Sequence, residues 1–292
     1  MGRRAWLNLV LLVVVVALAA LAYLQPGREP EAPPRLTELN SAEVQRVTLR
    51  RAEGARLVLQ RRDRDWYLAE PVEVAARGFQ VTRLLDMLNL ESLQRFPVVA
   101  SELPKYGLQS PRARLKADGV ELAFGGLNPL NGRRYVRVDD MIHMVAQDDS
   151  ALLTSDWWAF VATAPLPDEP LQRLALPGLG VIERAADGWH YTGERPPASA
   201  DQLQALVDAW RHAQALQVRP LDSGDSAGVV EIDLASGIEM RLALRRGEGE
   251  VVLQRRDLGL EYVFDAAQGQ RLFEWPEVAG GEYEQGTQGE EV

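Results

Sequence analysis

The chain has 292 residues, enough to bury a sizeable core in one large domain or two small ones. Its formal net charge is −10, which is the wrong sign for a general nucleic-acid-binding protein, so we expect no nucleic-acid partner. Because the chain contains no cysteine, structural disulfides and thiolate metal sites are excluded.

An apolar segment, residues 6–24, follows Arg3 and Arg4, and Asn8 is its only strongly polar residue. As a helix it would measure roughly 28 Å, close to the hydrocarbon thickness of a bilayer. This length favours an uncleaved signal anchor over a cleaved signal peptide, which stays open as the alternative. The Arg pair predicts a cytoplasmic N-terminus. In a bacterium, residues 1–25 would then anchor the chain in the inner membrane by a single pass, with a periplasmic or extracytoplasmic body.

Residues 26–36 are rich in proline and charge, which predicts an extended stalk between membrane and body. Further along, helices are predicted at residues 80–90 and 202–212, each with apolar side chains at positions i, i+3, i+4 and i+7. These apolar positions are Val81, Leu84, Leu85 and Leu88 in the first helix and Leu203, Leu206, Val207 and Trp210 in the second, a constant offset of 122 residues. A strand that opens with tryptophan, Trp66 or Trp189, precedes each helix. The body therefore reads as a duplicated unit.

Four β-like runs separated by turn residues follow each predicted helix. They are residues 113–117, 120–124, 134–138 and 142–145 in the first half and 229–234, 239–244, 250–254 and 261–264 in the second. Each half is therefore predicted to be an α+β unit, an antiparallel sheet or meander with one packed helix. We place the first unit at residues 37–165, the second at 166–275 and an acidic, disordered tail at 276–292.

Two stretches, residues 49–67 and 244–262, are alike in sequence but lie 195 residues apart, which is not the offset of the repeat. Alternating apolar residues around a Glu-Gly turn predict a β-hairpin in each. We interpret the likeness as convergent hairpin chemistry, because all but two of the 32 basic residues are arginine and local Arg clusters arise easily. Arg50, Arg61 and Arg62 stay candidates for binding an acidic partner.

The sequence contains no recognisable catalytic or metal-binding constellation. His143 and His212 lack a metal-ligating neighbour at i+2 or i+4, and His190 has only Glu194 at i+4. The one Gly-x-Ser-x-Gly pattern, at residues 224–228, lies in LDSGDSAG, which reads as a turn and not as a nucleophile elbow between a strand and a helix. The acidic pairs at residues 139–140 and 148–149 lack the pattern of a calcium loop. We therefore expect no enzyme, no catalytic residue, no metal site and no cofactor.

Trp157 and Trp158, in the stretch SDWWAFV, form the largest aromatic cluster. Exported aromatic side chains can stack on sugar rings or anchor a protein partner. The favoured interpretation is that they seal the first unit against the second, with partner binding as the alternative.

Three motifs together resemble a known family. They are DWYLAEPVEVAARGFQVTRLLDML from residue 65, KYGLQSP from residue 105 and FGGLNPLNGRRYVRV from residue 124. The combination resembles the bacterial family called domain of unknown function 4340, over residues 44–153. The second half lacks the YGL element and resembles the family only through the internal repeat. The resemblance implies a membrane-anchored protein associated with gliding-motility-like ABC transport systems, with no defined catalytic residues.

Together these features predict a non-enzymatic, single-pass membrane-anchored extracytoplasmic protein. We expect an accessory or scaffold subunit that binds a protein partner in an ABC-type transport or other envelope complex. An envelope glycan-binding module, with Trp157 and Trp158 on the sugar, is the alternative. A hydrolase with an unrecognised carboxylate pair is a third and weaker one.

Overall fold

A computed structural model describes residues 2–24, 34–146, 150–197, 199–222 and 224–276. In these residues the strands form two antiparallel sheets, accompanied by helices, which confirms the α+β class. The predicted stalk, except residues 34–36, and the predicted tail, except Pro276, lie outside the described residues, as do Asp148 and Asp149.

Helix α1 spans Arg3–Leu24 and contains the whole apolar run. The apolar side chains of residues 6–20 are exposed, with Trp6 at 67% and Leu7 at 64% of full exposure. Within the described ranges, no helix is long and apolar enough to cross a membrane. The predicted N-terminal helix is thus present, but this finding does not support a membrane span by it, and the single-pass anchor is not confirmed.

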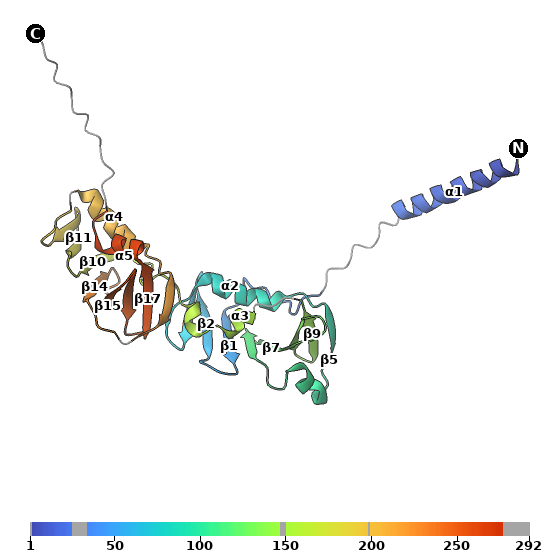
Figure 1. Ribbon diagram of the computed structural model, residues 1–292, viewed down its shortest axis with the longest axis horizontal. Coiled ribbons are helices and arrows are strands. Elements are labelled where there is room, and N and C mark those ends of the chain that lie inside the picture. The colour runs from blue at the N-terminus through green and yellow to red at the C-terminus, as the bar shows by residue number, and fades with distance from the viewer. Residues whose placement is uncertain (1, 25–33, 147–149, 198, 223, 277–292) are drawn as a thin grey trace, which may run out of the picture.

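The first unit, from β1 to η3, is built on a nine-stranded sheet (Figure 1). Across the sheet the strands are β4 (Val74–Ala75), β3 (Asp65–Glu70), β2 (Leu57–Arg62), β1 (Arg46–Arg51), β6 (Ala113–Ala117), β7 (Val120–Leu127), β8 (Arg134–Val138), β9 (Met141–Val145) and β5 (Gln94–Pro97). The chain thus builds β1 to β4 outward to one edge, crosses to the opposite edge at β5, and returns to place β6 beside β1 in the centre.

Helix α2 (Gly78–Asp86) makes this crossing and continues as a 3-10 turn, η1 (Met87–Asn89). Its buried side chains are those of the predicted apolar face, Val81, Leu84 and Leu85, with Leu88 buried in η1. The predicted helix, residues 80–90, is thus confirmed with a tighter last turn. The remaining helical elements of the unit are η2 (Ala100–Tyr106), α3 (Ser150–Thr154) and η3 (Trp157–Phe160). We call the sheet face opposite α2 the open face.

The second unit, from β10 to α5, is built on an eight-stranded sheet. Across it the strands are β12 (Gly188–Thr192), β11 (Gly180–Ala185), β10 (Leu171–Leu176), β14 (Gly228–Leu234), β15 (Glu239–Gly247), β16 (Glu250–Arg255), β17 (Leu260–Asp265) and β13 (Gln217–Pro220). Helix α4 (Ala200–Arg211) begins where the Ser199 hydroxyl accepts a hydrogen bond from the Gln202 amide at 3.3 Å, a typical N-cap. Helix α5 (Ala266–Phe273) follows β17 and ends the unit.

The two sheets follow the same path. Each has a three-stranded meander, a helix, an edge strand at the far side, and a four-stranded meander that starts beside the first strand. The four strands predicted after each helix are confirmed, and β4 alone has no counterpart among the described strands of the second unit. That the two halves arose by duplication of one sequence stays a prediction.

Both predicted hairpins are present. The stretch 49–67 contains the β1–β2 hairpin, and 244–262 contains the β15–β16 hairpin with Gly249 at a φ of 80° in its turn. They occupy different places in the shared path, since β1 and β2 precede the helix whereas β15 and β16 follow one. Local hairpin chemistry, not equivalence of position, accounts for their likeness.

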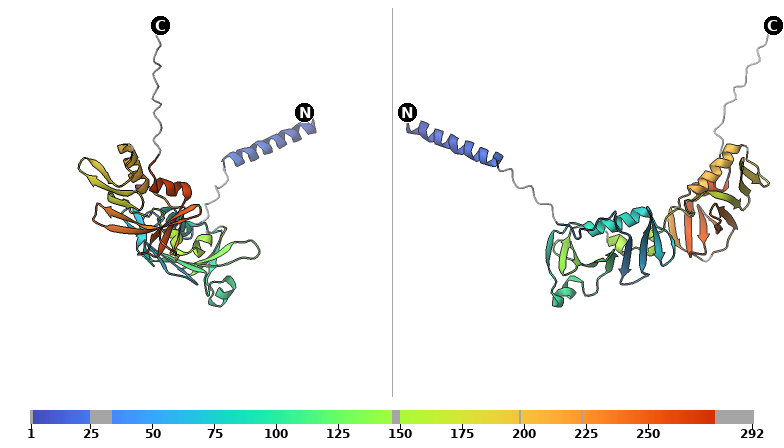
Figure 2. Two further views of the ribbon diagram at one scale, coloured as in Figure 1. Left: turned by 60° about the vertical axis from the view of Figure 1, so that its left-hand side comes forward. Right: turned by 180° about the vertical axis from the view of Figure 1, so that it is seen from behind.

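Figure 2 shows the two units end to end. They meet where η3 packs against β13, and the Ala215 amide donates a hydrogen bond to the Thr163 carbonyl at 2.9 Å. The predicted boundary between units falls between η3 and β10. Elements that the periodicity did not indicate are short, at eight residues or fewer: β4, β5, η2, α3, η3, β10, β13 and α5.

Candidate functional site

The open face of the first sheet carries a cluster of cations. On β1 and β6 the side chains alternate, so that Leu49 and Leu115 are buried in the core that also contains the apolar face of α2, while their neighbours project from the opposite side. We define the basic face by the cations that line one depression of about 310 Å³ there: Arg46, Arg50, Arg56, Arg114 and Lys116. Asp118 and Glu121 lie at its rim.

The strand register places like charges together. Arg50 is directly opposite Arg114 in the β1–β6 pairing, and Lys116 is opposite Thr48. Like charges at opposed positions destabilise an antiparallel pair, so this arrangement costs the fold some stability. A site that retains such a cost is a candidate for binding an anion that offsets it.

Ion pairs within the chain satisfy only part of this charge. Arg114 pairs with Glu121 at 2.9 Å, and Arg56 lies 3.5 Å from Glu70. Asp118 instead accepts hydrogen bonds from the backbone amides of Gln45 at 2.8 Å and Arg46 at 2.9 Å. In the part of the chain that the structure describes, the side chains of Arg46, Arg50 and Lys116 have no carboxylate partner.

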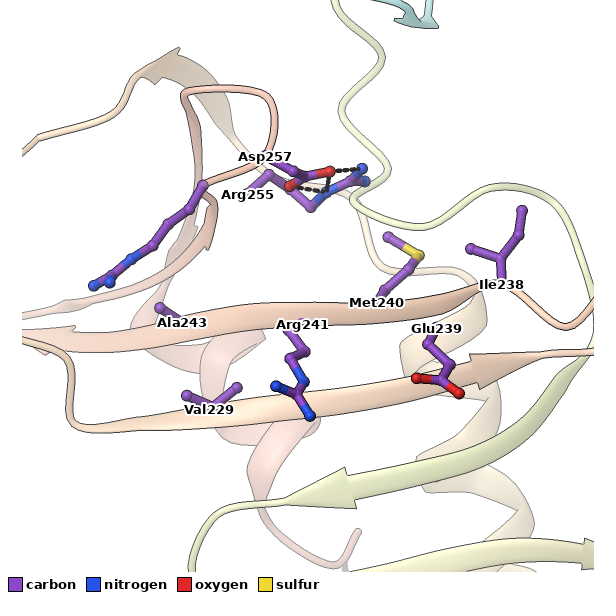
Figure 3. Close-up of a pocket in the computed structure, with 9 residues that line it drawn as sticks. Val229, Ile238, Glu239, Met240, Arg241, Ala243, Arg255 and Asp257 are labelled. Atoms are coloured by element: carbon purple, nitrogen blue, oxygen red, sulfur yellow. Dashed lines mark hydrogen bonds and ion pairs between the residues drawn. The ribbon is translucent and has the colours of Figure 1, made fainter.

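A larger depression, of about 480 Å³, lies on the second sheet (Figure 3). Two of its three arginines are paired, Arg255 with Asp257 at 2.7 Å and Arg241 with Glu231 at 3.4 Å, which leaves Arg256 as its one cation without a carboxylate partner in the described residues. Arg255 also donates to the Pro165 carbonyl at 3.3 Å, which ties the turn to the junction between units. Size alone therefore does not make this depression the better candidate.

Of the three predicted arginines, Arg50 alone lies in the basic face. Arg61 stacks 5.0 Å from the centre of the Trp66 ring and donates a hydrogen bond to the Ala42 carbonyl. Arg184 and Trp189 repeat this pair at 5.3 Å at the equivalent place in the second unit, which indicates a packing role for both.

Arg62 is held in a similar way. It lies 4.9 Å from the centre of the Tyr67 ring and 2.6 Å from the Glu73 carboxylate. The stretch 49–67 therefore does not present its arginines as one continuous surface.

Trp157 and Trp158 lie in η3, edge to face with ring centres 5.8 Å apart. Both are half-buried and pack against the core, and η3 contacts β13 of the second unit and α2 of the first. This geometry supports the interpretation that the two rings seal the first unit against the second.

The histidines lie far apart in the fold. His143, on β9, is buried, and its Nδ1 lies 2.8 Å from the Ser92 hydroxyl. Burial, with a smaller contribution from Arg95, lowers the pKa of His143, which favours the neutral ring at pH 7. His190 lies 2.8 Å from Asp187, and His212 lies 2.9 Å from the Asp208 carbonyl.

The YGL motif covers part of the open face, a role that periodicity could not indicate. Tyr106 packs on Phe96 and Tyr135 with ring centres 5.3 and 4.8 Å away. Gly107 has a φ of 66°, and a Cβ there would lie 2.9 Å from the Gly126 amide nitrogen. A Cβ on Gly125 would collide with the Tyr106 carbonyl oxygen. The YGL and FGGL motifs are therefore two sides of one close backbone contact.

At the matching position the second sheet uses charge. Glu261, which pairs with Arg219 and Gln254, takes the place of Ile142, which pairs with Phe96 and Arg137. Its fully buried carboxylate accepts hydrogen bonds from three side chains and one amide. The donors are Gln254 at 2.8 Å, Arg219 at 2.9 Å, Arg245 at 3.2 Å and the Asp222 amide at 3.2 Å. On the second sheet the open face is the side opposite α4, and the loop after β13 is thereby tied to it.

Comparison with known proteins places this architecture in a family. No curated protein and no solved structure matches the chain significantly. The family model described as "Domain of unknown function (DUF4340)" matches residues 66–229, more than half of the chain. The match runs from Trp66 in β3 to the start of β14, so it extends beyond residue 153, where the resemblance in sequence stops, into the second unit. The chain therefore belongs to the DUF4340 family.

Proposed function

We propose that this chain is a non-enzymatic protein, anchored in the inner membrane by α1, whose extracytoplasmic body docks an acidic surface of a protein partner on the basic face. One observation carries the proposal: the cations of Arg46, Arg50 and Lys116 are gathered in one depression without a carboxylate partner in the described residues. A partner that supplies carboxylates would offset the repulsion between Arg50 and Arg114.

The charge of the rest of the chain favours a small acidic surface over a long polyanion. The basic face is a local feature of a chain with a net charge of −10, which would repel an extended nucleic acid or acidic polymer. A glycan would need accessible aromatic faces, whereas Trp157 and Trp158 are half-buried against the core. The resemblance to membrane-anchored proteins of ABC transport systems supports an accessory or scaffold role in such a complex.

A photo-crosslinking side chain at position 50 is expected to capture the docked protein in intact cells. The reason is that this position projects into the depression from β1. Adding R46E/K116E to the same chain should lower the crosslink yield by about tenfold, because reversed charges repel an acidic surface. The measurement is the crosslinked band on a gel, with its components identified by mass spectrometry.

Arg64 provides the matched control. It is exposed in the β2–β3 turn, outside the basic face, so a crosslinker there should give no such band. Equal capture from positions 50 and 64, or capture from position 50 that R46E/K116E leaves unchanged, would contradict the proposal.

Deletion of residues 2–24 is expected to release the chain from the membrane. The exposed apolar side chains of α1 are the part of the chain best suited to a hydrocarbon environment. The full chain should stay in the membrane pellet after an alkaline carbonate wash, and the deletion variant should appear in the supernatant. A V13R/V15R variant, which keeps the length of α1, should behave like the deletion. Retention of both variants in the pellet would show that something other than α1 holds the chain.

A further inference from the structure

The open faces of the two sheets have opposite charge at matching places. Because β1, β6 and β7 match β10, β14 and β15, the cross-strand pair Lys116–Glu121 has the same position as the pair Glu231–Arg241. In the first unit the cation lies on β6 and the carboxylate on β7, whereas in the second unit the carboxylate lies on β14 and the cation on β15. In the second unit we define the acidic face as the charged side chains around this pair on the open side: Glu183, Glu231, Asp233 and Glu239, with Arg173 and Arg241.

Formal charges on the two faces are complementary. The basic face has five cations and, with its two rim carboxylates, a net charge of +3. The acidic face has four carboxylates and two arginines, a net charge of −2. Arg173 contacts Glu183, Glu231 and Asp233 at 3.3 to 4.0 Å, which leaves these acids in excess over the cations beside them.

Two charged side chains of the acidic face that lie on β15, Glu239 and Arg241, are exposed. Figure 3 shows Glu239 and Arg241 projecting from the same side of β15, opposite Met240. Glu239 has no cationic partner in the described residues, so it mirrors the unpaired Arg50 of the basic face.

The two faces cannot meet within one chain, because the units lie end to end (Figure 2). We infer that the basic face of one chain binds the acidic face of a second copy. This inference rests on the proposed function and names the partner of the same face. Confinement of both copies to one membrane would raise their effective concentration, so a contact that is weak in solution can form there.

Sedimentation velocity of the full chain in non-ionic detergent, over a range of concentrations, tests the contact. We expect reversible self-association that weakens by about tenfold or more when the ionic strength is raised to about 0.5 M, where charges are screened within a few ångströms. The variants R50E/K116E and E231K/D233K should each weaken association by a similar factor, since each places like charges on facing surfaces.

Mixing these two variants provides the decisive arm. The intact acidic face of R50E/K116E then meets the intact basic face of E231K/D233K, and the two reversed faces, with net charges of −1 and +2, are complementary as well, so association should return. Thermal unfolding of each variant alone serves as the folding control, and recovery on mixing shows directly that both are folded.

A wild-type chain that stays monomeric at every concentration in low salt would overturn the inference. So would association that neither salt nor either variant weakens, because it would then run through α1 or another surface. Neither outcome contradicts the docking of a different protein on the basic face, which the crosslink from position 50 measures separately.

Discussion

Glu261→Ala is expected to destabilise the second unit by about 3 kcal/mol. Removing one partner of a buried ion pair costs about 3–5 kcal/mol because an uncompensated charge is left behind. The lower end applies, since Arg219 and Arg245 keep 31% and 22% side-chain exposure and can be partly hydrated. Urea unfolding followed by tryptophan fluorescence measures the loss.

The pH dependence of stability, measured with a second variant at this position, separates charge from packing. Burial raises the pKa of Glu261, but hydrogen bonds from Gln254, Arg219 and the Asp222 amide and the charge of Arg245 outweigh it, so the pKa lies below its ordinary value of 4.5. A depressed carboxyl pKa stabilises the fold above the unfolded value, and this contribution is lost as pH falls through the folded value.

The unfolding free energy of the wild type should therefore decrease below about pH 4.5 more steeply than that of Glu261→Gln, which keeps the shape but not the charge. The same slope in both proteins would show that Glu261 is not the titrating group.

Gly125→Ala is expected to destabilise the first unit by about 3 kcal/mol. The added Cβ would collide with the Tyr106 carbonyl oxygen, a backbone atom that can move only if the YGL segment lifts from the sheet. Overpacking of this kind typically costs about 1–3 kcal/mol, and the rigid neighbour argues for the upper end. The measurement is again chemical unfolding, in this case with proteolysis of the segment around Tyr106 as a local probe.

Gly126→Ala is the matched control one residue away. Its Cβ would lie 3.5 Å from the same carbonyl oxygen, an ordinary contact, so the unfolding free energy should change by less than about 0.5 kcal/mol. If both alanines had the same effect, loss of glycine flexibility, and not the contact with Tyr106, would be the cause.

Most strands of the two sheets could be predicted from the sequence, because alternation and turn residues are local features of the chain. Strands β6 and β8 begin and end at the predicted residues, 113–117 and 134–138, where alternation is regular and turn residues bound each run. Both long helices of the body were indicated by their apolar face, and their boundaries differ from the predicted ones by one or two residues when η1 is counted as the last turn of α2.

The candidate site could be predicted only in part, because it depends on pairing between distant strands. Arg50 was a candidate, but nothing local reveals that Arg114, on a strand that pairs with it only in the fold, lies directly opposite. Arg61 looked equivalent to Arg50 until its position against Trp66 was known. Glu261 gave no signal at all, since its burial follows from donors on three other segments.

The shared strand order has a consequence for where the chain can be divided. The family match begins at Trp66, which leaves out β1 and β2, and ends before most of β14. A fragment cut at those limits would lack the strand that joins the two halves of the first sheet, and it would retain the first meander of the second sheet without the strands that complete it. Each unit closes only when its first strand meets a strand made after the helix. The segment between η3 and β10 is therefore the place where a cut separates the body without opening either sheet.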